Sequence, residues 1–130
     1  MASGLVLASP RLGCSLLQGD GYRGNLLVVA RGECSFATKA HFAERAGAVG
    51  LIVTQNSLFP PFAMNWDQMD QMMYAEPEIP LVMISQIAGA ELRGLHDQCA
   101  LSSSTRERDS TLLQWHTIED HPACRCKLLA

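Results

Sequence analysis

The chain has 130 residues, of which 48% are hydrophobic and 18% are charged. This composition is typical of one compact domain and excludes an intrinsically disordered chain. The formal net charge of -3 and the pI near 5.7 provide no basic footprint, so we expect no nucleic-acid partner. No apolar run reaches the roughly 18 residues that a bilayer span requires, so we expect no membrane span in this chain.

The first residues, "MASGLVLASPRLGC", contain a short apolar patch with no basic region before it. This pattern does not match a signal peptide, so we expect either a cytosolic chain or one that has lost its targeting segment. An odd number of cysteines leaves at least one thiol unpaired in an oxidising compartment. The five are Cys14, Cys34, Cys99, Cys124 and Cys126.

A strand, a helix and a second strand are predicted in succession after Gly24. The apolar run 25–30 is typical of a strand covered on both faces, and Ser35 is placed to cap a helix over 36–46. A second apolar strand follows at 51–53. Short joints between these elements predict a right-handed crossover and two parallel strands. The helix residues at inward spacing are Phe36, Lys39, Ala40, Ala43 and Ala46.

A third strand is predicted over 79–85, with Pro80 at its beginning because proline cannot donate to a ladder. A second helix is predicted over 86–98, weakened by Gly89 and Gly94. Its expected inner contacts are Ile87, Ala90, Leu92 and Leu95.

The long segment between the second and third strands has two interpretations. One is a short helix over 67–74 that packs its methionines into the core; the other is an adaptable apolar surface for a peptide or partner. The apolar side chains in question are Met64, Trp66, Met69, Met72, Met73 and Tyr74. We expect the acidic residues of this segment to form a solvated face rather than a calcium site. They are Asp67, Asp70, Glu76 and Glu78.

The helical and strand patterns end after Cys99. We expect a polar linker over 102–109 and a weakly ordered tail to residue 130. The tail holds a weak zinc candidate whose spacing matches no standard finger, so we expect no metal and no cofactor. Its residues are His116, His121, Cys124 and Cys126.

Three motifs in order resemble the protease-associated (PA) domain family. They are "GC" at 13–14, "LLVVARGECSFATKAHFAERAGAVGLIVTQN" at 26–56 and "IPLVMISQIAGAELRGL" at 79–95. The resemblance covers approximately residues 7–98. It implies a mixed α+β fold: a small β-sandwich or partly open barrel with two or three flanking helices and one parallel βαβ unit. It also implies strands before the "GC" motif, so we expect a PA-like domain over 1–101 whose N-terminal edge is truncated and uncovered.

The resemblance further implies a module without chemistry of its own. PA domains accompany subtilase-like proteases, zinc aminopeptidases, membrane RING ubiquitin ligases, presenilin-like proteases and sorting receptors, where they act as lids or select substrates or cargo. We therefore expect a non-enzymatic module that binds a protein or peptide ligand or a parent catalytic module. The alternative is a fragment or splice variant of a larger PA-containing protease, ubiquitin ligase or sorting receptor. The family suggests a secretory, endosomal or extracellular location.

Cys34 sits before a helix N-terminus, where a thiol pKa is lowered. A nucleophilic thiol needs a nearby base, yet His41 lies seven residues on, about 10 Å away by helical rise, so we expect no catalytic residue. The family resemblance implies a disulfide between Cys14 and Cys34; a free buried thiol is the alternative.

Arg31 has two interpretations: a local ion-pair or carbonyl-capping group, or a cation that faces a ligand. Gly32 is expected to give the backbone freedom at the turn. A small thiol or zinc enzyme is a third, less favoured hypothesis for the whole chain. The predicted ligand-binding residues are Arg31, Gly32, Phe36, Met64, Trp66, Met69 and Tyr74.

Overall fold

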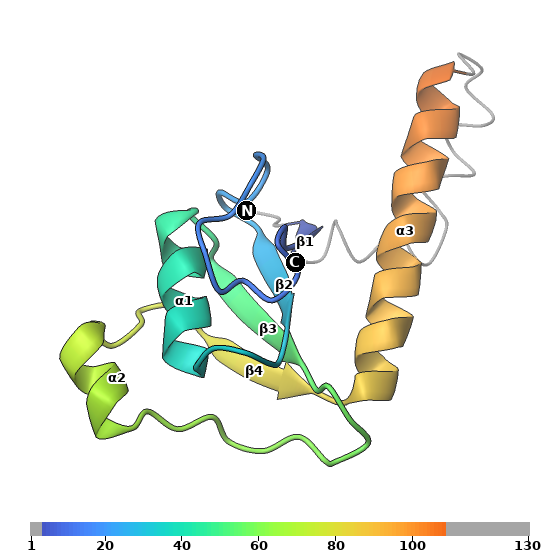
Figure 1. Ribbon diagram of the computed structural model, residues 1–130. Helices are drawn as coiled ribbons and strands as arrows, with labels where there is room; N and C mark the ends of the chain where they lie inside the picture. Colours follow the sequence, from blue (N-terminus) through green and yellow to red (C-terminus); the bar gives the residue numbers. More distant parts are fainter. Residues whose placement is uncertain (1–3, 109–130) are drawn as a thin grey trace.

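The computed structural model describes the backbone of residues 4–108 and the side chains of residues 4–98. Four strands and three helices follow one another along the chain (Figure 1). They are β1 (Leu5–Leu7), β2 (Leu26–Ala30), α1 (Phe36–Arg45), β3 (Gly50–Thr54), α2 (Gln68–Met73), β4 (Leu81–Ile84) and α3 (Gln86–Arg108).

The strands form one parallel sheet in the order β1-β2-β3-β4. β2 and β3 pair over their full length, from Leu26 opposite Gly50 to Ala30 opposite Thr54. The mixed α/β class and the parallel strand–helix–strand unit are therefore confirmed. The described residues make a single open sheet, neither a two-sheet sandwich nor a closed barrel, because helices occupy both faces and leave no face for a second sheet.

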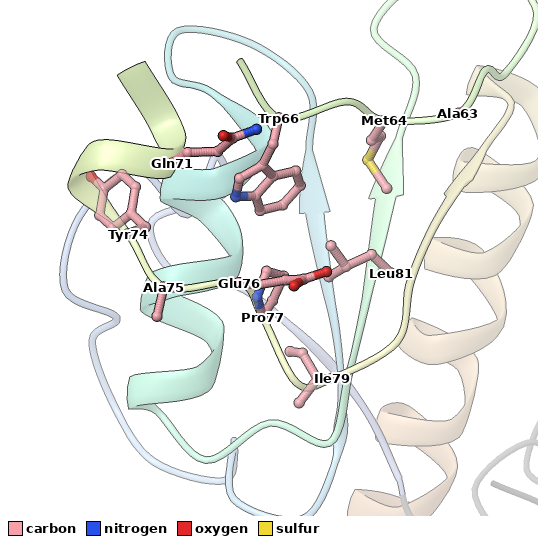
Figure 2. A pocket seen from close by; sticks show the side chains of 10 residues that line it. All are labelled: Ala63, Met64, Trp66, Gln71, Tyr74, Ala75, Glu76, Pro77, Ile79 and Leu81. Atoms are coloured by element: carbon pink, nitrogen blue, oxygen red, sulfur yellow. The ribbon is translucent and has the colours of Figure 1, made fainter. Parts of the chain in front are cut away.

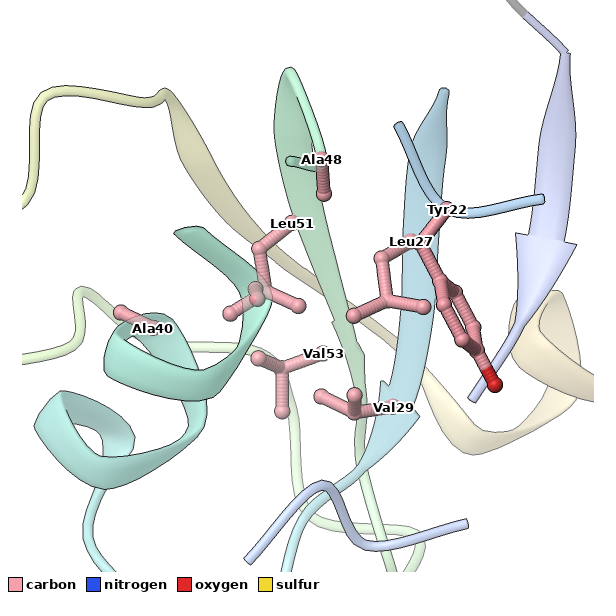
Figure 3. Packing of buried hydrophobic residues seen from close by; sticks show 8 residues of the cluster. Tyr22, Leu27, Val29, Ala40, Ala48, Leu51 and Val53 are labelled. Atoms are coloured by element: carbon pink, nitrogen blue, oxygen red, sulfur yellow. The ribbon is translucent and has the colours of Figure 1, made fainter. Parts of the chain in front are cut away.

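α1 covers one face of this sheet. Ser35 caps it, with its side chain accepting a hydrogen bond from the Thr38 N–H, as expected for a serine at this position. The core forms where small alanines of α1 meet the inward side chains of β2 and β3 (Figure 3). Its buried members are Tyr22, Leu27, Val29, Ala40, Ala43, Ala48, Leu51 and Val53.

α3 covers the opposite face. Successive strand residues point to opposite faces, so Thr54 points away from the side that Val53 shares with α1. Gly89 of α3 packs against the Thr54 side chain, which places α3 on that second face (Figure 1). Three of the four expected inner contacts of this helix were wrong: Ile87 is 62% exposed, Leu95 is 37% exposed and Ala90 is also exposed, whereas Leu92 is partly buried. Gly89 is buried instead, because the helix approaches the sheet along its smallest side chain.

Two boundaries differ from the sequence prediction. β1 covers the free edge of β2 with three parallel pairs, where an uncovered edge was expected. α3 continues to Arg108, so helix occupies most of the 102–109 segment that was expected to be a linker. The polar residues of this segment hide the apolar periodicity by which a helix is recognised. They do not break a helix, because neither glycine nor proline occurs between 95 and 108. No helix in residues 4–108 has the length and apolarity to cross a bilayer.

Candidate functional site

The turn after β2 is fixed by a disulfide. Gly32 has a φ of 133°, a conformation that glycine adopts without a side-chain clash, as expected for this position. Cys34 is bonded to Cys14, the pairing that the family resemblance implied, with 5.8 Å between their Cα atoms. The bond closes a loop with a sequence separation of 20. In this state Cys34 has no thiolate to act as a nucleophile.

A buried lysine forms hydrogen bonds to the backbone of the same turn. Lys39 is completely buried, and its Nζ donates to the carbonyl oxygens of Leu12 at 2.7 Å and Gly32 at 2.9 Å. The Nζ atom also lies 3.6 Å from the Cys14 sulfur. Burial lowers the pKa of Lys39 to about 8, against a smaller opposing effect of the Glu33 carboxylate. The amine thus joins the two chain segments that the disulfide connects.

Arg31 is held by neighbours within the domain. Its Nη1 donates to the Gln55 side-chain oxygen at 2.8 Å, and its guanidinium lies 5.0 Å from the centre of the Phe62 ring. Phe62 in turn contacts Phe36 edge-on at 6.0 Å between ring centres. The local interpretation of Arg31 is therefore the one that the contacts favour: it fastens the β3–β4 loop, residues 55–80, to the turn after β2.

The β3–β4 loop divides its apolar side chains between core and solvent. Met64 and Trp66 pack against the core cluster. Met69, Met72 and Met73 are 64%, 85% and 63% exposed, so the interpretation that the methionines fill the core is wrong for these three. They are exposed because the short α2 turns a different residue inward, as its capping shows.

Asp67 and Asp70 cap the N-terminus of α2. The Asp67 side chain accepts from the Asp70 N–H at 2.8 Å, and the Asp70 side chain accepts from the Asp67 N–H at 3.3 Å. This reciprocal pair is a capping box. Asp70 is buried, so the expectation of a solvated acidic face is wrong at this residue. Among the described side chains, residues 4–98, no cluster of three metal-ligating groups occurs.

A cavity of about 820 Å³ opens between this loop and β4; we call it the loop cavity (Figure 2). Its lining is Ala63, Met64, Trp66, Gln71, Tyr74, Ala75, Glu76, Pro77, Ile79 and Leu81. The Trp66 Nε1 atom is buried without a hydrogen-bond partner among the described residues. Tyr74, at the end of α2, packs against α1. Its hydroxyl accepts a hydrogen bond from the Thr38 hydroxyl at 3.2 Å, and the centre of its ring lies 4.8 Å from that of His41.

The predicted ligand residues thus separate into two groups. Met64, Trp66 and Tyr74 line the loop cavity, whereas Arg31 and Phe36 meet at Phe62 outside it. Met69 and Gly32 line neither the loop cavity nor the Phe62 contact. The sequence prediction missed the other lining residues, among them Ile79 and Leu81. These two are separated by one residue in the predicted strand, a spacing that indicated a shared face. The zinc candidates His116, His121, Cys124 and Cys126 lie outside the described residues.

The outer edge of β4 runs beside the loop cavity. The carbonyl oxygens of Pro80 and Ile84 accept hydrogen bonds from the N–H groups of Leu51 and Gln55. The backbone groups of every second residue in this strand therefore point toward β3. The N–H and C=O groups of Leu81 and Met83 therefore point away from the sheet. No backbone group in residues 4–108 bonds to them. A strand edge of this kind is a template for a further strand.

Comparison with known proteins decides the family. A family model described as PA domain matches residues 2–92. The chain belongs to the PA domain family.

Several proteins resemble this PA domain. Signal peptide peptidase-like 2 of Arabidopsis thaliana is 37% identical over 90 residues, which are 68% of this chain and 16% of that protein. Signal peptide peptidase-like 5 of Oryza sativa subsp. japonica is 34% identical over 88 residues, 68% of this chain and 16% of that protein. The ER degradation-enhancing alpha-mannosidase-like protein 3 of Xenopus laevis is 41% identical over 58 residues, 43% of this chain and 6% of that protein.

The chain therefore spans a small part, at most 16%, of the length of these relatives. Among solved structures, BSAP, a zinc aminopeptidase from Bacillus subtilis, aligns with a TM-score of 0.46 and 27% identity. That alignment covers 55% of this chain and 16% of the aminopeptidase.

Proposed function

We propose that this PA domain is a non-catalytic module that binds an extended peptide segment of a partner protein in the loop cavity. One observation carries the proposal: a cavity of about 820 Å³, lined by Met64, Trp66 and Leu81 among others, adjoins the free edge of β4. Cavities of roughly 300–1,000 Å³ are typical of ligand sites, and the walls of this one combine apolar side chains with polar groups such as Gln71 and Glu76.

The walls of the cavity supply contact area for apolar side chains. Met64, Ile79 and Leu81 present flexible and branched apolar groups, and Met64 can adjust to different ligand shapes. The Trp66 ring adds an aromatic surface against which an apolar side chain of the peptide packs.

The β4 edge supplies the second half of the recognition. An extended peptide added beside β4 forms main-chain hydrogen bonds with Leu81 and Met83, while its alternate side chains enter the cavity. Main-chain bonding of this kind tolerates different sequences. The module therefore selects for an extended conformation and apolar side chains at alternate positions rather than for one fixed sequence.

We further propose that the module serves a larger protein and selects substrates or partners for it. The small share of its relatives that the chain spans supports this role. The Cys14–Cys34 disulfide supports a secretory or endosomal compartment, because disulfides persist in oxidising environments. The names of the relatives, which include signal peptide peptidase-like and ER degradation-enhancing proteins, agree with this compartment.

Peptide selection with a cavity-filling variant tests the proposal. The full chain, with its disulfide formed, is used to select from a phage-displayed random peptide library, and the dissociation constant of the best peptide is measured by fluorescence anisotropy. Ala63→Trp fills the cavity from its exposed rim, and we expect at least tenfold weaker binding. Leu58→Trp is the matched control, since Leu58 is 80% exposed on the same loop and does not line the cavity. Equal weakening by both variants, or by neither, contradicts the proposed site.

A further inference from the structure

A second cavity, of about 530 Å³, lies where β2 and β3 end. Strand ends supply Ala30, Thr54, Gln55 and Asn56; the segment before Cys14 supplies Arg11 and Leu12; and α3 supplies Gln86, Gly89, Ala90 and Arg93. We call it the arginine cavity. It shares no lining residue with the loop cavity.

The charges of the arginine cavity are all positive. Arg11 and Arg93 line it, and no acidic side chain does. Neither guanidinium forms a hydrogen bond or ion pair within the described part of the chain. Burial lowers the pKa of Arg93, the positive charge of Arg11 lowers it further, and Asp97 only partly offsets these effects. Two like charges thus converge without a counter-charge between them.

The backbone holds these groups in place. The Ala30 N–H donates to the Arg11 carbonyl at 3.1 Å, which fixes the segment that carries Arg11 to the end of β2. A Cβ on Gly89 would lie 2.7 Å from the Thr54 Cγ2, so glycine is what allows α3 to approach β3 this closely. Arg93 follows Gly89 by four residues and therefore projects from the same side of the helix. The cavity and the spacing of its charges are consequences of the fold.

We propose that the arginine cavity binds a carboxylate of a peptide partner. A guanidinium donates two parallel hydrogen bonds to a planar carboxylate, and a second guanidinium completes the neutralisation. The volume exceeds the ~30 Å³ share of one water many times over, so it accommodates a side chain or chain end and not a small ion alone. Asn56 and Gln86 also line the cavity, and a side-chain amide can both donate to and accept from a peptide group.

The carboxylate has two sources in a peptide, an Asp or Glu side chain and a C-terminal end, and the probes separate them. Ac-Gly-Glu-Gly-Glu-Gly-NH2 presents side-chain carboxylates, Ac-Gly-Gly-Gly-OH presents a chain end, and Ac-Gly-Gln-Gly-Gln-Gly-NH2 presents neither. Inorganic phosphate is the fourth probe. Each is titrated into the 15N-labelled full chain with its disulfide formed, and the Arg Nε–Hε and Asn56 amide signals are followed.

We expect one carboxylate peptide to shift the Arg93 and Asn56 signals saturably, with the glutamine peptide at least tenfold weaker. Arg93→Gln and Arg11→Gln each weaken that binding at least tenfold, and Arg93→Lys weakens it less, since it keeps the charge but loses the bidentate geometry. Arg45→Gln is the control: it removes the same charge at the end of α1, at the opposite end of the sheet, and changes the affinity less than twofold.

Equal affinity for the glutamate and glutamine peptides overturns the proposal, as does an Arg93→Gln variant that binds like the original chain. Saturation by phosphate with no shift by either carboxylate peptide overturns the assignment to a peptide. These outcomes are independent of the loop cavity, because Ala63→Trp, which fills that cavity, leaves the arginine cavity unchanged. Failure at one site is therefore distinguishable from failure at the other.

Discussion

The buried amine of Lys39 makes the stability of the domain depend on pH in an unusual direction. Lys39 is fully buried, and its pKa falls from 10.5 to about 8 because burial disfavours the charged form. Between these two pH values the unfolded chain binds more protons than the folded chain. The free energy of unfolding therefore rises as the pH increases from 8 toward 10.5.

The size of this effect follows from the same two values. Each pKa unit corresponds to about 1.4 kcal/mol, so the folded state gains about 3 kcal/mol across this range. A neutral amine still has two protons, enough to donate to the carbonyls of Leu12 and Gly32. The Lys39→Met variant has no group to titrate at this position, so its free energy of unfolding lacks the gain.

Urea unfolding followed by circular dichroism from pH 7 to 10.5 measures the difference between the two proteins. Both carry serine at Cys99, Cys124 and Cys126, so that no free thiolate attacks the disulfide at high pH. Other titrating groups are common to both proteins and cancel in the comparison. We expect the original chain to gain about 3 kcal/mol relative to Lys39→Met. Parallel pH profiles for the two proteins would refute the reasoning.

Three further predictions concern the frame around the sites. Replacing Cys14 and Cys34 with alanine removes a loop closure over a sequence separation of 20, and we expect urea unfolding to show a loss of about 3 kcal/mol; an unchanged midpoint contradicts this. Gly89→Ala places a Cβ against the buried Thr54, and we expect a net loss of about 1–3 kcal/mol despite the better helix propensity of alanine. A gain in stability would contradict this, because it would show that α3 can shift away from Thr54 at little cost. Asp67→Ala removes half of the capping box, and faster amide hydrogen exchange in α2, by about tenfold, is the expected result; unchanged exchange contradicts it.

The sequence predicted those parts of the fold that depend on local pattern. Ser35 began a helix, two apolar runs formed adjacent parallel strands, and Gly32 adopted a positive φ, each because the residue type itself favours that conformation. Lys39 shows the limit of this reasoning. Its inward spacing was visible, but its carbonyl acceptors lie 27 and 7 residues away and become neighbours only in the folded chain.

The candidate site was predicted less completely than the fold. Trp66 and Met64 stood out by type, and they do line a cavity, but the position of Met69 depended on which face of α2 turned inward. The buried Asp70 decided that orientation through a capping box that apolar periodicity does not encode. Arg11 and Arg93 are far apart in the chain, and only the packing of α3 on the sheet brings both to one cavity.

The indole N–H signal of Trp66 tests the central claim most directly. The full chain contains two tryptophans, so Trp115→Phe leaves a single indole signal in a 15N–1H spectrum. On addition of a library-selected peptide, we expect this signal to shift saturably, because the Trp66 side chain lines the cavity that the peptide enters. The amides of Leu81 and Met83 should become protected from hydrogen exchange at the same time. A peptide that binds tightly while all three signals stay unchanged would contradict the account.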